Sequence, residues 1–501
     1  MKRRSDTQVT SLLVPARETR AERRERVEAE AQIARALAAG QLAQAEALAA
    51  EKAALAELRR DVPRLGLPGP AQGRPRKRLR LRPHTDTTAT LYAAFPFLAE
   101  RGLGAEGMLI GSDVFSREAF YFDPWRLYAA GVITNPNMLI AGIVGKGKSS
   151  LAKSLVTRGL AFGRRAYVPA DPKGEWSAVA RAVGGQVIEV GPGSATRINP
   201  LDPGPRPSDV SDAEWPHMVR SRRLELLKSL AETIAPHPLT PVERSAVAAA
   251  LDAATQRHEM PLLAHVVAYL FDPPAGAGLP AGFTGRDQLI ADGRTAGHAL
   301  QMMTAGDLTG VFDGPSTVVF DPAAPMVSVD LSRFGENSPH LPLVMAAMAS
   351  WMEAAVRDPA GGLRFMVYDE AWRTMRHPAL LRRMQSQWKL ARAWGIANVL
   401  VIHRLSDLAA VGEVGSADRE LAEGLLADCE TRVIYAQQRD QVATTDSKIG
   451  LTSTEAEFIP NLEQAQGLWK IGERSFLVAH EWSEAEAAVF ATDARMSEAA
   501  S

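Results

Sequence analysis

The pattern of apolar and polar positions changes character along the chain. From Glu18 to about Asp61 the residues are mainly Ala, Glu, Arg, Gln and Leu, with a loose apolar stripe at helical spacing. This composition predicts one broken helix or a helical hairpin within residues 1–62. The helix either packs on its own domain or binds a partner, including a second copy of the chain.

A segment rich in proline and glycine follows the predicted helix, and residues 63–90 are interpreted as a linker with one basic strand. In the run from Arg74 to Arg82, basic residues at 78, 80 and 82 alternate with leucines, which predicts a strand with one apolar and one basic face. A solvated edge strand is the simpler interpretation. Contact with acidic lipid or nucleic acid is the alternative, although aromatic residues do not interrupt the run.

From Leu91 onward, short apolar runs alternate with helical segments. Runs of this length are typical of buried strands, and strands separated by helices are typical of a parallel sheet covered on both faces. We therefore predict an α/β core. Its predicted strands are Asn137 to Ala141, Arg165 to Ala170, Gln186 to Val190, Met326 to Leu331, Arg364 to Asp369, Ala397 to Ile402 and Thr431 to Ala436.

Between Pro205 and about Gly314 the strand pattern stops, and helical stretches dominate. They are predicted at Asp212 to Ile234, Pro241 to Thr255, Leu262 to Phe271 and Gly293 to Thr304. The predicted organisation is therefore a core in two parts, residues 91–204 and 316–501, with an all-α insertion at residues 205–315.

Composition narrows the class of protein further. The chain has 501 residues, and 57 Lys and Arg against 58 Asp and Glu give a net charge of -1, so nucleic acid would have to be bound through a local surface. The single cysteine, Cys429, excludes an intrachain disulfide partner and fits a reducing compartment. The N-terminus has no signal-peptide pattern, and no apolar stretch reaches the roughly 20 residues of a membrane span.

A glycine-rich segment carries the clearest chemical signal. Its sequence matches G-x-x-x-x-G-K-[ST], with an apolar strand before it and a helical pattern after it. Backbone N–H groups can turn toward phosphate oxygens, while Lys148 would reach the β- and γ-phosphates and Ser149 would ligate Mg²⁺. The sequence thus predicts binding of ATP and Mg²⁺. The predicted nucleotide-binding loop consists of Gly142, Ile143, Val144, Gly145, Lys146, Gly147, Lys148, Ser149 and Ser150.

The predicted strand Arg364 to Asp369 ends in two adjacent carboxylates. Open α/β sheets bind ligands at the carboxyl ends of their strands, so both acids are expected beside the P-loop. Asp369 is the expected second Mg²⁺ partner, and Glu370 the expected base or water-orienting residue. Together with the P-loop lysine they predict ATP hydrolysis. They argue against a nucleotide-gated scaffold without turnover, which we keep as an alternative.

Other polar residues follow predicted strands of the same sheet. Asp171 and Glu175 either contact the nucleotide or a neighbouring subunit, or they form a strand-end turn. His403, followed by Arg404, is predicted to sense the γ-phosphate or to cap its strand. Arg392 precedes that strand on a basic helix, and it could act as an arginine finger in cis or in a neighbouring subunit, or lie on a solvated face.

Taken together, these motifs resemble those of the conjugation and type IV secretion ATPases of the VirB-four, TraC and TrbE kind, within the HerA/FtsK superfamily. The resemblance runs from about Leu91 to Asp493. Its elements, in chain order, are G-I-V-G-K-G-K-S at Gly142 to Ser149, D-P-K-G-E-W at Asp171 to Trp176, I-N-P-L-D-P at Ile198 to Pro203, the helical insertion, D-E-A-W at Asp369 to Trp372, and T-R-V-I-Y after Asp428.

The resemblance implies a RecA-like P-loop NTPase core with a mainly parallel sheet, an all-α insertion and an N-terminal helical segment. It also implies a homo-hexamer with nucleotide between subunits. Lys148 and Ser149 would then belong to Walker A, Asp369 and Glu370 to Walker B, and Arg392 would be the finger. The chain departs from the family at the sensor, where a Gln after Thr is usual and His403 stands here, and in its short N-terminal region.

The implied function is an ATP-hydrolysing motor for conjugative transfer or type IV secretion. Such a motor would be cytoplasmic, peripheral to the inner face of the cell membrane, and bound to apparatus proteins there, with DNA as a further candidate partner. The alternative is a free DNA translocase or packaging ATPase of the HerA/FtsK kind. Secretion is favoured because no N-terminal membrane span is present and little chain follows Thr431 to Ala436, the predicted last strand.

Overall fold

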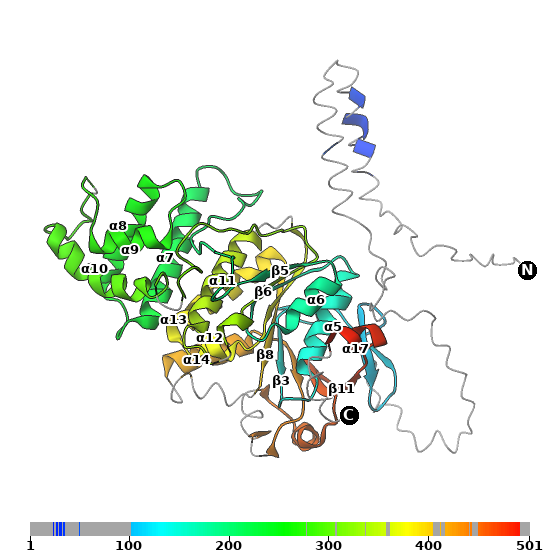
Figure 1. The fold of residues 1–501 in the computed structure, drawn as a ribbon. Coiled ribbons are helices and arrows are strands. Elements are labelled where there is room, and N and C mark those ends of the chain that lie inside the picture. The colour runs from blue at the N-terminus through cyan, green and yellow to red at the C-terminus, as the bar shows by residue number, and fades with distance from the viewer. Residues whose placement is uncertain are drawn as a thin grey trace, which may run out of the picture.

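An 11-stranded sheet forms the centre of the protein in the computed structural model (Figure 1). The structure describes residues 102–490, with gaps at 277, 306–307, 336, 357–360, 404–410, 412–415, 440 and 443–448, and a few helical positions between Arg24 and Ala50. The predicted N-terminal helix is described only at those positions. The linker and basic strand predicted at residues 63–90, and also Arg404, lie outside the described residues.

Seven neighbouring strands of the sheet are parallel, in the order β9-β3-β8-β7-β4-β6-β5. All seven correspond to strands predicted from the sequence, so the predicted α/β core is confirmed. The strands are β3 (Met138–Ala141), β4 (Arg165–Asp171), β5 (Gln186–Glu189), β6 (Met326–Asp330), β7 (Arg364–Tyr368), β8 (Ile396–Ile402) and β9 (Thr431–Ile434).

Four antiparallel strands extend the sheet beyond β9, and the sequence analysis missed them. They are β1 (Met108–Asp113), β2 (Ala119–Phe122), β10 (Gln466–Ile471) and β11 (Arg474–His480), in the order β2-β1-β11-β10-β9. The interpretation of Thr431 to Ala436 as the last strand is therefore wrong. A signal for the hairpin exists, because a two-residue turn beginning with Gly472, whose φ is 58°, joins two apolar runs.

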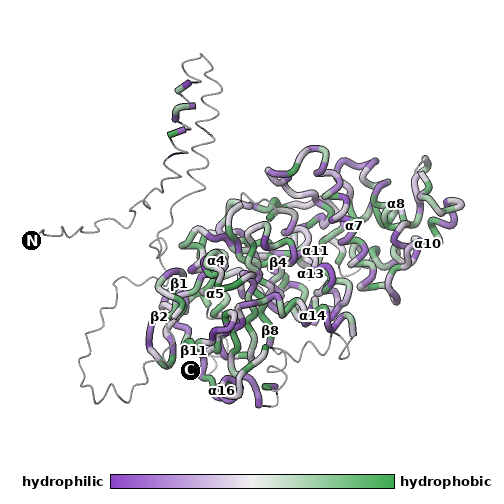
Figure 2. Tube along the Cα trace, turned by 180° about the vertical axis from the view of Figure 1, so that it is seen from behind, coloured by the Kyte–Doolittle hydropathy of each residue, from purple (hydrophilic) through white to green (hydrophobic). Residues whose placement is uncertain are grey.

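Helices cover both faces of the parallel strands. One face carries α5 (Lys148–Leu160), α6 (Glu175–Ala182) and α17 (Glu484–Phe490), and the other carries α11 (Leu341–Val356), α13 (Pro378–Ala391) and α14 (Ala417–Ala427). Successive residues of β3 alternate between the two cores: Met138 and Ile140 pack with α5, and Leu139 and Ala141 with α13 and α14. Both faces of the strands are thus buried, and β8 is hydrophobic in Figure 2.

The helical insertion packs beside α11 and α13, at the end of the molecule away from α5 (Figure 1). It consists of α7 (Trp215–Ile234), α8 (Pro241–Arg257), α9 (Leu263–Phe271) and α10 (Arg286–Gln301), close to the predicted helices. Helix α10 begins before the predicted Gly293. That glycine lies inside α10, where a Cβ would approach Leu270 Cδ2 to 3.2 Å, so it permits close packing on α9. Three short helices complete the described fold: α4 (Pro124–Ala129), α12 (Trp372–Met375) and α16 (Ser453–Phe458).

Cys429 follows α14 and is fully buried. Its thiol donates a weak hydrogen bond to the carbonyl oxygen of Leu425 at 3.8 Å, and burial raises the pKa of the thiol. The unreactive thiol form is therefore favoured, which suits a structural role. Across the described ranges, none of the helices combines the length and apolarity needed to cross a bilayer.

A buried ion pair ties the P-loop helix α5 to the C-terminal helix α17. The guanidinium of Arg158 contacts both carboxylate oxygens of Glu486, at 2.8 Å and 2.7 Å, and also donates to backbone carbonyls of β1 and of Glu481. Both side chains are almost completely inaccessible. The pair therefore fixes the far end of the helix that begins at the P-loop.

Replacing Arg158 by Met is expected to destabilise the protein by about 3 to 5 kcal/mol, because the carboxylate of Glu486 would stay buried without its partner. Chemical denaturation measures the change. The control is Arg181→Met, which breaks the exposed pair with Glu189 and is expected to change stability by less than about 1 kcal/mol. Equal losses for the two variants would contradict the structural role of the buried pair.

Candidate nucleotide-binding site

The loop between β3 and α5 has the backbone conformation of a phosphate-binding loop. Three of its glycines have φ values in the left-handed region, which are 150° at Gly142, 80° at Gly145 and 104° at Gly147. At Gly142 a Cβ would lie 2.5 Å from the Cβ of Tyr435, so no larger residue fits there. The positions predicted to need glycine are therefore glycines for a steric reason.

Backbone hydrogen bonds with the segment between β9 and β10 hold this loop in place. The N–H of Ile143 donates to the carbonyl oxygen of Ala436 at 3.0 Å, and the N–H of Ala465 donates to the carbonyl oxygen of Lys146 at 3.0 Å. The Lys146 ammonium in turn reaches the carbonyl oxygen of Leu462 at 3.4 Å. The segments after β9 and before β10 thus belong to the site, which the sequence analysis did not anticipate.

Lys148 stands at the start of α5, and only 4% of its surface is exposed. Its ammonium donates to the carbonyl oxygen of Ile143 at 2.9 Å. Burial lowers the pKa of Lys148 to about 8, although the charges of Asp369 and Glu370 act in the opposite direction. A buried ammonium held by a single neutral acceptor suits an arriving anion, and the adjacent Ser149 and Ser150 are half-buried on the first turn of α5.

Asp369 follows β7, which is separated from β3 by β8 in the sheet. Its Oδ2 accepts a hydrogen bond from the indole N–H of Trp176 at 3.0 Å. Burial raises the pKa of Asp369, and the charge of Glu370 adds to the effect. A divalent cation would oppose this shift, so the position suits a metal ligand.

Glu370 is nearly buried, at 4% exposure, and its φ of 56° is rare for a residue with a side chain. Its Oε1 lies 2.6 Å from the ammonium of Lys173 and 2.8 Å from Nε2 of His403. Its Oε2 accepts from the indole N–H of Trp372 at 2.6 Å. Although burial acts to raise its pKa, the hydrogen bonds from His403 and Lys173 hold the pKa of Glu370 well below its usual range.

Lys173 is the site residue that the sequence analysis missed. It lies on the turn between β4 and α6, where Gly174 has a φ of 71°. The signal was its place in D-P-K-G-E-W, since the end of β4 lies on the same rim of the sheet as the P-loop. Only the fold shows that the lysine, rather than the two acids of that motif, meets Glu370.

Asp171 and Glu175, the two acids of this motif, are engaged in the turn itself. The Asp171 carboxylate accepts hydrogen bonds from the N–H groups of Glu175 at 3.2 Å and Trp176 at 2.7 Å, and so caps the first turn of α6. Burial raises the pKa of Asp171 to about 7. Glu175 forms an ion pair with Lys153 at 3.2 Å. These contacts favour the strand-end alternative for both residues.

His403 contacts Glu370, whereas Arg392 lies far from the P-loop. Arg392 begins a 3-10 turn (Arg392–Trp394) before β8, is exposed, and donates to the carbonyl oxygen of Thr134, which precedes β3, at 3.4 Å. Arg392 and Thr134 therefore both lie at the amino ends of their strands. The phosphate-binding end is about 20 Å away along β8. This position disfavours an action of Arg392 in cis. The alternatives that remain are the site of a neighbouring subunit and a solvated surface position.

The residues present fit a nucleoside phosphate with Mg²⁺. Within the ranges that the structure covers, no group of three or more His, Cys, Asp or Glu side chains is arranged to hold a metal. A dedicated protein cage is not what Mg²⁺ needs, since it commonly binds one or two protein oxygens, waters and substrate phosphates. Ser149 and Asp369 can supply such a pair.

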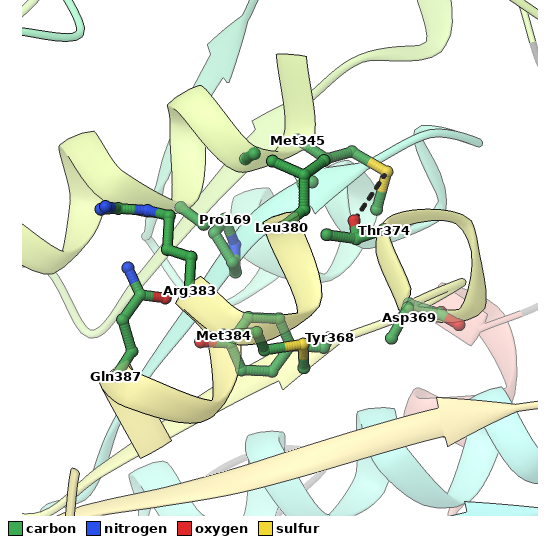
Figure 3. A pocket seen from close by; sticks show the side chains of 13 residues that line it. Pro169, Met345, Tyr368, Asp369, Thr374, Leu380, Arg383, Met384 and Gln387 are labelled. Carbon is green, nitrogen blue, oxygen red and sulfur yellow. Dashed lines mark hydrogen bonds between the residues drawn. The ribbon is translucent and has the colours of Figure 1, made fainter. Parts of the chain in front are cut away.

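A small apolar pocket of about 30 Å³ lies beside Asp369 (Figure 3). Its walls come from β4, α11 and α13, with Pro169, Met345, Tyr368, Leu380 and Met384 among the labelled side chains. Asp369 lies at one end, and Arg383 and Gln387 at the other. Because the lining is mostly apolar, this pocket does not suit phosphates, and the P-loop rim stays the candidate site.

Comparison with known proteins supports the same fold. No family model and no curated protein sequence matches the chain. The structure of VirB4 of Thermoanaerobacter pseudethanolicus matches with a TM-score of 0.62 and 19% identity, over 77% of this chain and 100% of that chain. The plasmid coupling protein TrwB, in complex with the non-hydrolysable ATP analogue ADPNP, matches with a TM-score of 0.50 and 16% identity, over 70% and 86%. These matches confirm the predicted fold.

Proposed function

We propose that the chain is an ATP-hydrolysing motor of a conjugation or type IV secretion machine. The observation that carries the proposal is the position of Lys148 after β3 and of Asp369 and Glu370 after β7, at one rim of the sheet, where the charges of both acids act on the lysine. The fold shared with VirB4 and with the coupling protein TrwB supports the kind of machine.

Each residue has a distinct task in this proposal. The loop amides and Lys148 would hold the β- and γ-phosphates, while Ser149 and Asp369 would hold Mg²⁺, which neutralises phosphate charge when bound. Glu370 would orient or deprotonate the attacking water. His403, whose Nε2 contacts Glu370, would position that carboxylate rather than touch phosphate itself.

The proposal includes assembly and location. We infer a homo-hexamer with the nucleotide between subunits, in which the exposed Arg392 would act at a neighbour's site. The expected partners are apparatus proteins at the inner face of the cell membrane, with DNA as a further candidate. The protein itself is expected to be cytoplasmic and peripheral to that membrane.

A free DNA translocase or packaging ATPase is the second candidate function. The structural match to TrwB, a plasmid coupling protein, favours keeping it. The described residues after β9 form β10, β11, α16 and α17, which complete the sheet and its cover. A scaffold without turnover is disfavoured because a positioned glutamate serves hydrolysis and not binding.

The direct test is binding and hydrolysis of ATP by Lys148→Ala. We expect Mg²⁺-dependent phosphate release by the wild-type protein, and an ATP affinity at least about tenfold lower in the variant, since a charge-assisted hydrogen bond contributes roughly 1.5 to 3 kcal/mol. Lys228→Ala, on α7 of the insertion, is the matched control and should bind normally. A wild-type protein that binds no nucleotide would refute the proposed function.

A further inference from the structure

The carboxylate of Glu370 is fully engaged by three donors in the structure. Lys173 and His403 both contact Oε1, and Trp372 contacts Oε2. Lys173 makes one of the two shortest of these contacts, and a second positive charge, the guanidinium of Arg373, lies 3.9 Å from Oε2. A carboxylate held in this way is poorly placed to accept a proton from water, so some contact must be released before Glu370 can act.

The contact between Lys173 and Glu370 is the one that can be released. The backbone on its C-terminal side is anchored, because Asp171 caps the start of α6 through the N–H groups of Glu175 and Trp176. Its side chain, in contrast, is 33% exposed, while that of Glu370 is 4% exposed. The lysine can therefore change partner at its tip while its backbone and the glutamate stay in place.

The alternative partner would bind at the same rim of the sheet. Lys148 follows β3 and Lys173 follows β4, so both lie at the carboxyl ends of parallel strands, where the positive charge of Lys173 adds to the burial that lowers the pKa of Lys148. A γ-phosphate between them would present more negative charge than one carboxylate. It would compete with Glu370 for Lys173, because charge-assisted hydrogen bonds to phosphate are among the strong ones.

We propose that Lys173 is a positioning residue that holds Glu370 in the nucleotide-free protein and transfers to the γ-phosphate when a nucleoside triphosphate binds. The transfer removes one of the two contacts to Oε1 of Glu370 only when the substrate is present, and a diphosphate, which lacks the γ-phosphate, does not trigger it. This inference rests on the proposed function and assigns to Lys173 the discrimination between triphosphate and diphosphate.

Titration calorimetry with ADP and with the non-hydrolysable analogue ADPNP, both with Mg²⁺, tests the inference without hydrolysis. Lys173→Met is expected to weaken ADPNP binding by about tenfold or more, the value of one charge-assisted hydrogen bond, and to leave ADP affinity unchanged. Lys173→Arg, which keeps the charge, should retain most of the preference. Lys228→Met, on α7, is the control for loss of a lysine elsewhere, and normal ADP binding reports that each variant is folded.

A second comparison uses Glu370→Gln, which weakens the competitor for Lys173. The substitution is expected to tighten ADPNP binding in the wild-type background, and to do so much less in the Lys173→Met background, because contacting residues are not additive. An equal gain in both backgrounds would mean simple charge repulsion and would overturn the inference. So would an unchanged ratio of ADPNP to ADP affinity in Lys173→Met. Failure of the wild-type protein to bind either nucleotide would instead refute the proposed function.

Discussion

The Glu370→Gln variant is expected to bind ATP and Mg²⁺ but to hydrolyse ATP about 10² to 10⁴ times more slowly than the wild-type protein, the usual value of a positioned base. The amide keeps the size of the side chain and can still accept the indole N–H of Trp372, which contacts Oε2 at 2.6 Å. It cannot take the proton of an attacking water. Steady-state phosphate release, together with binding of a fluorescent ATP analogue, separates the loss of turnover from a loss of affinity.

Glu457→Gln is the control for this experiment, since it removes a carboxylate from the exposed surface of α16. Its rate should equal that of the wild-type protein. Should Glu370→Gln also retain the wild-type rate, Glu370 would not be the base, and the structural reason for its left-handed backbone would have to be sought in packing.

A mixture of two inactive variants is expected to regain activity if the protein works as a ring. Arg392→Ala removes the exposed arginine at the amino end of β8, and Lys148→Ala removes the lysine of the P-loop. In mixed rings some interfaces combine an intact Lys148 with an intact Arg392 from the neighbour. An arginine finger contributes roughly 10³ to 10⁵ in rate, so even a minority of such interfaces should exceed the background of either variant alone.

Three controls accompany the mixing experiment. Each variant must assemble, Arg392→Ala must still bind ATP, and Arg181→Ala, which removes an exposed arginine from α6, should remain active on its own. Activity is measured as the ratio of the two variants changes. A mixture that stays inactive in rings demonstrated to be mixed would mean either that Arg392 is not the finger or that firing requires every interface. Arg404 would then be the next residue to test.

The sequence was most informative where one local pattern decides the structure. The seven parallel strands are short apolar runs with helices between them, and each lies where the pattern predicts it. The P-loop could also be predicted from a local pattern, because the spacing of its glycines, lysine and serine lies within a few consecutive residues. Arg392 also had a local signal that was not used: a residue that precedes a strand lies at the edge opposite to that strand's carboxyl end.

The contacts of Glu370 could not be predicted in the same way. Its partners Lys173 and His403 follow strands β4 and β8, which flank β7 in the sheet, and strand order is a property of the whole fold. The antiparallel strands were missed for a related reason. β10 pairs with β9 and β11 pairs with β1, and both pairings join segments that are distant in the sequence.

The contact between the P-loop and the antiparallel end of the chain has a consequence for synthesis. The P-loop is held by Ala436 and Ala465, which contact Ile143 and Lys146. At about 5 to 20 residues per second, these two alanines leave the ribosome roughly tens of seconds after the P-loop. Until then, β3 lacks its neighbour β9, and the nascent chain presents an unpaired strand edge. Nucleotide loading should therefore mark chains that have finished folding, and partly made chains should depend on chaperones to protect this edge.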